Sequence, residues 1–85
     1  MKNEAREIIN NKSIVYPLFE LRERWRDEGK YEDFNEYITV IKNSVEKQGY
    51  KFIKLTKTFS LTLEGKFATY CINLKGNSAS INLAK

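Results

Sequence analysis

The 85-residue chain contains no histidine and only one cysteine, Cys71. A single cysteine cannot form a disulfide within the chain, and its rarity is typical of a reducing compartment. Without histidine and with one thiol, one chain cannot supply the ligand set of a zinc, haem or iron–sulfur centre, and histidine-based general-base catalysis is excluded. We therefore expect a protein that is not an enzyme and that holds neither a metal nor another cofactor.

Long apolar runs and glycine clusters are also missing. No apolar run approaches the ~20 residues that are needed to cross a bilayer, and the N-terminal segment MKNEAREIINNK lacks an apolar signal region. Glycine-rich phosphate loops are excluded because the glycines stand alone, at positions 29, 49, 65 and 76. We expect no membrane segment and a cytoplasmic location.

What is present suffices for one compact domain over residues 1–85. Hydrophobic residues make up 41% of the chain and aromatic residues 13%, which supports a single core. The apolar spacing is helical over residues 1–48 and alternates over residues 50–84. We predict an α+β fold in which two to three N-terminal helices pack on one face of a C-terminal three-stranded antiparallel meander.

The helical half contains three candidate helices. The first is predicted over about Asn3–Asn11, and the second from Pro17, a favourable first helical residue, to about Glu28. Residues 14–16 form a short apolar bridge between them. The third has a buried face with three-four spacing, and Gly49 fits the left-handed position after it, with Tyr50 folding back on Val45.

Alternation in the second half predicts three strands, within 53–63, 68–74 and 79–83. A two-residue turn at residues 65–66 would place Leu61 opposite Tyr70, and one at residues 76–77 would place Ile72 opposite Ile81. Both registers put every apolar residue on one face and the threonines on the other. Residues 50–55 then extend beyond the meander, and they could bend away, pair with residues 14–16, or form a homodimer by pairing with a second copy of the chain.

Charge is divided unequally between the two halves. Residues 1–48 carry nine basic and ten acidic side chains, whereas residues 49–85 carry six lysines and one acid, Glu64. A strongly basic β half indicates a surface that attracts a polyanion.

The candidate nucleic-acid contacts follow from this charge. Lysines converging on phosphates give salt-dependent binding, and exposed aromatic rings can stack on unpaired bases. We name Arg22 and Arg26 as secondary candidates, because acidic neighbours balance much of the charge on their helix. The primary candidates are Lys51, Lys54, Lys57, Lys66 and Lys75, with Tyr50 and Phe52 between them.

The segment KFIKLTKTF at residues 51–59, together with a Lys/Asn/Ile-rich composition and the chain length, resembles the small early proteins of T-even phages. Within that group the chain is similar to the TifA-type inhibitors of the ToxN ribonuclease toxin. The resemblance implies an RNA-binding counter-defence protein that acts in the host cytoplasm and neutralises a bacterial RNase toxin. It carries no motif from which site residues could be transferred.

Two function classes follow from the sequence. The first is an RNA-binding protein that uses a lysine-rich β surface, since hydroxyl and amide side chains around the lysines suit contacts to phosphate and to the ribose 2′-OH. The second is a protein-binding inhibitor or adaptor module that docks on an acidic partner without nucleic acid. The salt dependence of binding to mixed RNA separates the two.

Overall fold

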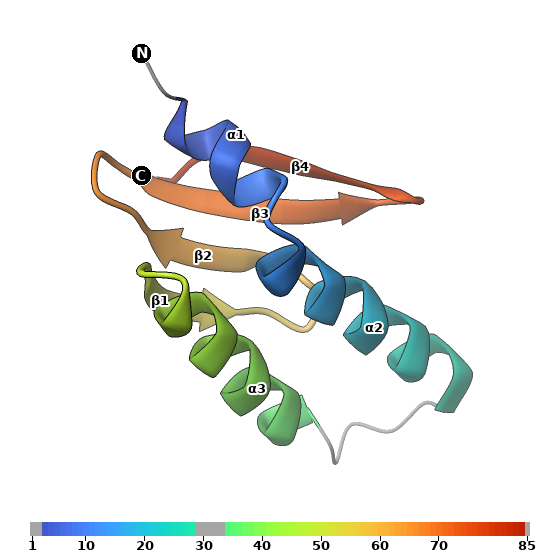
Figure 1. Ribbon diagram of the computed structural model, residues 1–85. Coiled ribbons are helices and arrows are strands. Elements are labelled where there is room, and N and C mark those ends of the chain that lie inside the picture. The colour runs from blue at the N-terminus through green and yellow to red at the C-terminus, as the bar shows by residue number, and fades with distance from the viewer. Residues whose placement is uncertain (1–2, 29–33, 85) are drawn as a thin grey trace.

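The computed structural model describes residues 3–28 and 34–84, except for the side chains of residues 25–28. Within these residues three helices precede four strands, so the described part is α+β as predicted but has one strand more than expected (Figure 1). The strands form one antiparallel sheet in the order β1-β2-β3-β4. The elements are α1 (Glu4–Ile9), α2 (Lys12–Glu28), α3 (Phe34–Lys47), β1 (Lys51–Leu55), β2 (Leu61–Glu64), β3 (Thr69–Lys75) and β4 (Ser78–Leu83).

The second helix begins earlier than the sequence suggested. The side chain of Asn11 accepts the N–H of Ser13 at 3.0 Å, which caps the start of α2. Pro17 therefore lies inside the helix, and the prediction that it starts the helix is wrong. Ile14 and Val15, expected in a bridge, are buried helical residues. Their burial offsets the one backbone hydrogen bond that Pro17 cannot make.

The end of α3 confirms the predicted cap. Gly49 has a φ of +93°, a conformation that costs glycine little. The N–H of Tyr50 donates to the carbonyl of Val45 at 3.2 Å, and the N–H of Gly49 donates to that of Glu46 at 3.1 Å. This pair of bonds is the Schellman ending. The buried side of α3 is also as expected, with Phe34, Ile41 and Val45 in the core.

The β3–β4 hairpin has the predicted register, in which Ile72 lies opposite Ile81 and Leu74 opposite Ala79. The β2–β3 hairpin differs by two residues, because Leu61 lies opposite Ile72 rather than Tyr70. Its connection runs over Gly65–Ala68 and is closed by a 2.8 Å bond from the N–H of Gly65 to the carbonyl of Ala68. A shift of two residues preserves the face of every side chain, so the apolar face is still as predicted.

Residues 53–63 are not one strand but the ends of two. The chain turns at Thr56–Ser60, where the N–H of Phe59 donates to the carbonyl of Thr56 at 3.0 Å and Phe59 has a φ of +63°. This is the three-residue hairpin loop whose last residue is left-handed. Glycine or asparagine usually occupies that place, and Phe59 gave no such signal. Residues 51–55 therefore pair with β2. The segment whose lack of a partner suggested a homodimer is thus paired within its own chain.

A bulge in β1 changes which of its side chains face the core. Phe52 lies opposite Leu63 and Leu55 opposite Leu61, with the register shift between Phe52 and Lys54. The extra residue, Ile53, is exposed, which corrects its predicted place in the apolar row. Phe52 occupies that row instead and packs against the core.

All three helices lie on one face of the sheet, and no described segment covers the other (Figure 1). The core is the layer between them, where apolar residues from α1, α2 and α3 meet alternate residues of the strands. Its fully buried members are Ile8, Ile14, Leu18, Leu21, Ile41, Val45, Leu61, Leu63 and Ile72.

Two leucines on the helix-covered face test this account. Leu61 is 0% exposed on an inner strand, whereas Leu83 on edge strand β4 is 71% exposed. We expect Leu61→Ala to lower the free energy of unfolding by about 2–5 kcal/mol, and Leu83→Ala to change it by less than about 0.5 kcal/mol. Urea unfolding measures both. Equal losses would contradict the burial described here.

Candidate nucleic-acid interface

The face of the sheet opposite the helices is polar, and we refer to it as the open face. Thr62 and Glu64 of β2 lie on the open face, and so do the residues paired with them on the neighbouring strands. Because successive residues of a strand alternate between faces, every second residue from these belongs to the open face as well. Ile53, the bulge residue of β1, has no partner in the ladder and is exposed. The members of the open face are Lys51, Lys54, Thr62, Glu64, Thr69, Cys71, Asn73, Lys75, Ser78, Ser80 and Asn82.

Three of the predicted lysines lie on the open face itself. Lys51 is opposite Glu64, so these two charges offset one another in part. Lys54 is opposite Thr62, and Lys75 stands at the end of β3. All three lysines are exposed.

The other two predicted lysines lie in loops at opposite ends of the sheet. Lys57 is in the β1–β2 loop, at the end where Lys75 closes β3, and Lys66 is in the β2–β3 loop, at the end where Lys51 begins β1. The five lysines are therefore distributed along the length of the open face and its two flanking loops, with Glu64 as the acid among residues 51–75.

A small polar network lies in the middle of this face. The Ser60 hydroxyl is 3.0 Å from the Cys71 sulfur, and the Asn73 amide donates to the same sulfur at 3.6 Å. Thr62 was expected to be exposed but is buried, because Lys54 and Cys71 flank it in the ladder. The centre of the face thus offers hydroxyl and amide groups rather than apolar ones.

The two predicted stacking residues do not lie on this face. Tyr50 and Phe52 are half-buried and pack against the core beneath the helices. Burial raises the pKa of the Tyr50 hydroxyl, and the negative charges of Glu7 and Glu4 raise it further. Their interleaving with lysines in the sequence comes from strand alternation, which sends neighbours to opposite faces.

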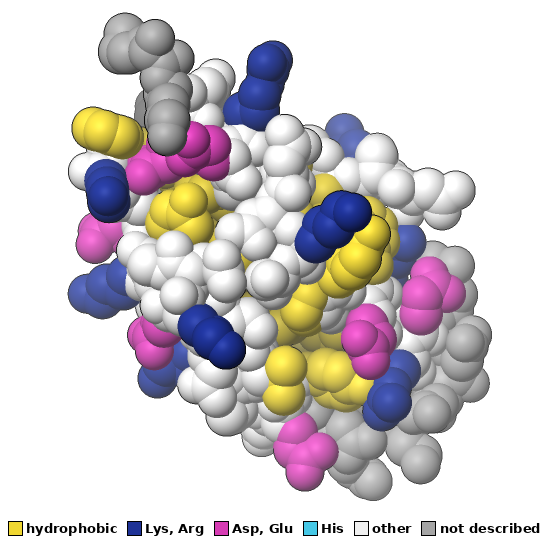
Figure 2. Space-filling view, viewed as in Figure 1, with side chains coloured by type: hydrophobic (Ala, Val, Ile, Leu, Met, Phe, Trp, Pro, Cys, Tyr) yellow, Lys and Arg dark blue, Asp and Glu magenta, His cyan; other side chains and the backbone are white. Residues whose placement is uncertain are grey.

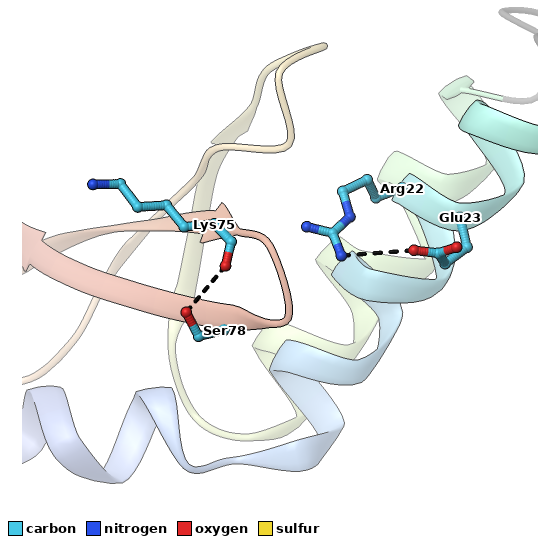
Figure 3. Close-up of polar contacts among 4 residues, drawn as sticks. All are labelled: Arg22, Glu23, Lys75 and Ser78. Atoms are coloured by element: carbon cyan, nitrogen blue, oxygen red, sulfur yellow. Dashed lines mark hydrogen bonds and ion pairs between the residues drawn. The ribbon is translucent and has the colours of Figure 1, made fainter.

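The helix arginines also belong to the other side of the molecule. The guanidinium of Arg22 lies 3.6 Å from Glu23 and 5.0 Å from the centre of the Phe19 ring, and its side chain is 13% exposed. Figure 3 shows it on α2, with the Lys75 side chain extending away from it. Arg24 lies over the Tyr37 ring at 5.6 Å. The side chain of Arg26 is outside the described residues.

A buried carboxylate holds the loop that carries Lys66. Glu4, in the first turn of α1, accepts the backbone N–H of Lys66 at 2.8 Å and that of Phe67 at 3.1 Å. It also accepts the hydroxyl of Tyr70 at 3.0 Å. We call this arrangement the Glu4 clamp. Its three donors satisfy a charge that would otherwise be costly to bury.

The clamp explains the glycine at position 65. A Cβ atom on Gly65 would lie 2.5 Å from Oε1 of Glu4, closer than side chains tolerate. A side chain at position 65 would displace the Glu4 carboxylate from its three donors, so glycine is needed there for space. The predicted two-residue turn at residues 65–66 does not form, because the closing bond runs from the N–H of Gly65 to the carbonyl of Ala68. Glu4 itself gave no sign of this role, since an acid in the first turn of a helix is ordinary.

The clamp changes the pKa values of both its side chains. Burial acts to raise the pKa of Glu4, but the two backbone N–H groups, the Tyr70 hydroxyl and the charge of Lys66 together lower it below 4.5. Burial raises the pKa of Tyr70 above 10.0, and the hydrogen bond to Glu4 and its charge raise it further. The folded state therefore favours an ionised Glu4 beside a neutral Tyr70.

An exposed aromatic residue that sequence reasoning missed lies in the same loop. Phe67 is 81% exposed, the highest value among the large hydrophobic residues that the structure describes. The sequence predicted a turn made of Gly65 and Lys66 alone, which placed Phe67 where the next strand begins and gave no sign that its ring would be exposed. The available signal was its position directly after Gly65 and Lys66 in a hairpin connection.

The described residues contain no group of three or more His, Cys, Asp or Glu side chains that could hold a metal ion. No helix in the described part of the chain is long and apolar enough to cross a membrane. The acidic residues Glu32 and Asp33, which precede α3 in the sequence, lie outside the described residues. Comparison with known proteins adds no assignment, since no protein-family model, curated protein or solved structure matches the chain.

The Glu4 clamp predicts a specific acid sensitivity. Because its folded pKa is depressed, Glu4 stabilises the fold above about pH 4.5, and this stabilisation is lost as the pH falls through the folded value. We expect Glu4→Gln to lower the free energy of unfolding by about 1–3 kcal/mol near pH 7. The difference from the parent protein should shrink as the pH falls through the depressed folded pKa of Glu4.

Urea titrations at several pH values measure this effect, with Glu46→Gln on the exposed side of α3 as the matched control. A difference between Glu4→Gln and the parent that stays constant from neutral to acid pH would contradict the clamp.

Proposed function

We propose that this protein binds RNA through the open face of its sheet. The observation that carries the proposal is a polar sheet face, left uncovered by the described segments, with five lysines on it and its flanking loops against Glu64. Lysines spread over such a surface can each neutralise a phosphate and release counterions. The proposed activity is binding rather than catalysis.

The polar groups between the lysines favour RNA as the polyanion. Thr69, Asn73, Ser80 and Asn82 supply hydroxyls and amides that donate to phosphate or pair with a ribose 2′-OH. These groups lie on a rigid antiparallel ladder, so they need little ordering when a strand binds. Contacts of this kind read the backbone and tolerate many sequences.

The helical side is less suited to a polyanion. Figure 2 shows basic and acidic side chains interspersed on this side, with hydrophobic groups gathered among them. A groove of about 320 Å³ lies between α2 and α3, and Glu20 and Glu36 line it together with Arg24. A phosphate chain or an acidic protein would meet like charge there.

The alternative is an adaptor that docks on an acidic protein without nucleic acid. It would use the same lysines, so charge alone does not separate it from RNA binding. Exposed hydrophobic residues elsewhere, such as Tyr16 and Val40, are its specific support. RNA binding with a steep dependence on salt favours the first proposal.

The resemblance to the TifA-type inhibitors supplies a biological setting for the proposal. In that setting the protein acts in the bacterial cytoplasm and neutralises an RNase toxin through RNA. Its support is the similarity in length, composition and the basic segment at residues 51–59. A ToxN-type ribonuclease arrests the growth of the bacteria that express it. Co-expression of the parent protein should restore that growth, and co-expression of a variant without the open-face lysines should not. Growth arrest unchanged by the parent protein would remove this setting.

A charge-matched pair of triple variants tests the RNA interface. The first replaces Lys51, Lys54 and Lys75 on the open face with Gln, and the second replaces the exposed helix lysines Lys12, Lys42 and Lys47. Both lose the same charge. We expect the open-face variant to bind mixed-sequence RNA more weakly and to lower the log–log salt slope by up to ~0.7 per lost phosphate contact.

The helix variant should retain most of the affinity and slope of the parent. Fluorescence anisotropy at several salt concentrations measures binding, and circular dichroism verifies that both variants fold. Equal losses in the two variants would point to net charge rather than to this face. Unchanged binding in the open-face variant would leave the adaptor as the better proposal.

A further inference from the structure

The β2–β3 loop displays an aromatic ring beside a positive charge. Phe67 is 81% exposed, and its neighbour Lys66 is exposed as well. A ring and an ammonium group side by side match the two parts of a nucleotide, since a ring stacks on a base and a cation pairs with its phosphate.

The Glu4 clamp makes this display rigid. The two N–H groups that Glu4 accepts belong to Lys66 and Phe67 themselves. These bonds fix the backbone of both residues to α1 and, through Tyr70, to β3. Because the backbone is held in this way, only the side-chain torsions of Phe67 have to be ordered when a base stacks on its ring, which lowers the entropic cost of binding.

The loop continues the open face at one of its ends. Glu64, the last residue of β2, lies opposite both Lys51 and Thr69, so the loop follows directly from a row of open-face residues. Figure 1 shows the connection between β2 and β3 projecting beyond that end of the sheet. A strand of RNA that crosses the open face toward this end therefore arrives at the loop that carries Lys66 and Phe67.

We propose that Phe67 stacks on an unpaired base while Lys66 contacts an adjacent phosphate, so that the preferred ligand is single-stranded RNA. This inference rests on the proposed RNA-binding function and adds the state of the RNA. Bases within a duplex already stack on their neighbours, so Phe67 could reach one only by unstacking it. An unpaired base has a free face for the ring.

A docking site for a protein would need a larger apolar surface around Phe67. The next most exposed large hydrophobic residue, Leu83 on β4, lies opposite Tyr70 and so belongs to the helix-covered face. The immediate neighbours of Phe67 in the chain are Lys66 and Ala68. A lone ring next to a charge fits a base better than it fits a hydrophobic partner.

Four substitutions at one position test the proposal, since the exposed ring can change without disturbing the core. The probes are a single-stranded uridine oligonucleotide of about 12 nucleotides and an RNA duplex of the same length. This length falls within the ~4–16 nucleotides that comparable single-strand sites cover. We expect Phe67→Ala and Phe67→Leu to weaken single-strand binding about 5- to 100-fold, from the usual energy of one base–aromatic stack. Phe67→Tyr and Phe67→Trp should keep the affinity of the parent.

The salt slope should be the same in all four variants, because no phosphate contact is lost. Duplex affinity should not change, and Leu83→Ala, which removes an exposed apolar side chain elsewhere, should leave both affinities intact. One outcome is that the parent binds RNA while Phe67→Ala and Phe67→Leu bind single strands with the same affinity as the parent. In that case the stacking inference is wrong and the proposed function stands. Retention by Phe67→Leu alone would indicate an apolar contact instead of stacking and would also overturn it. A parent that binds neither probe would overturn the proposed function and this inference together.

Discussion

The structure depends on a single constraint, that the described segments cover only one face of the sheet. Every strand must therefore send apolar and polar side chains to opposite faces, because a polar residue beneath the helices would be buried without a partner and an apolar row opposite would be exposed. Leu61 and Leu63 alternate with Thr62 and Glu64 on β2 in this way. The open face is thus a product of the same pattern that builds the core.

This constraint also determines where the lysines lie. A lysine at a position that alternates with buried residues must face solvent on the side away from the helices, as Lys51 does one residue before Phe52. The bulge in β1 adds a further cation to that side, because it returns Lys54 to the row of Thr62 after the extra residue Ile53. The basic character of the second half of the sequence is in this way concentrated on one surface and its two flanking loops.

The sequence predicted those parts of the fold that depend on local pattern. The Schellman ending at Gly49 and the β3–β4 register follow from a glycine in a required place and from alternation, and both are confirmed. The β1–β2 hairpin was missed because Phe59 adopts the left-handed conformation that glycine usually marks. The exposure of Phe67 depends on Glu4, far away in the chain, and no local pattern contains that contact.

The contact between Glu4 and Gly65 links two distant positions in a way that bears on how such sequences can diverge. The carboxylate occupies the space that any side chain at position 65 would need. A sequence with this fold that loses the acid at position 4 is released from the requirement for glycine at position 65. One that gains a side chain at position 65 must move or shorten the side chain of residue 4. The two positions should therefore covary, and their joint substitution in an alignment would identify the fold where overall similarity has faded.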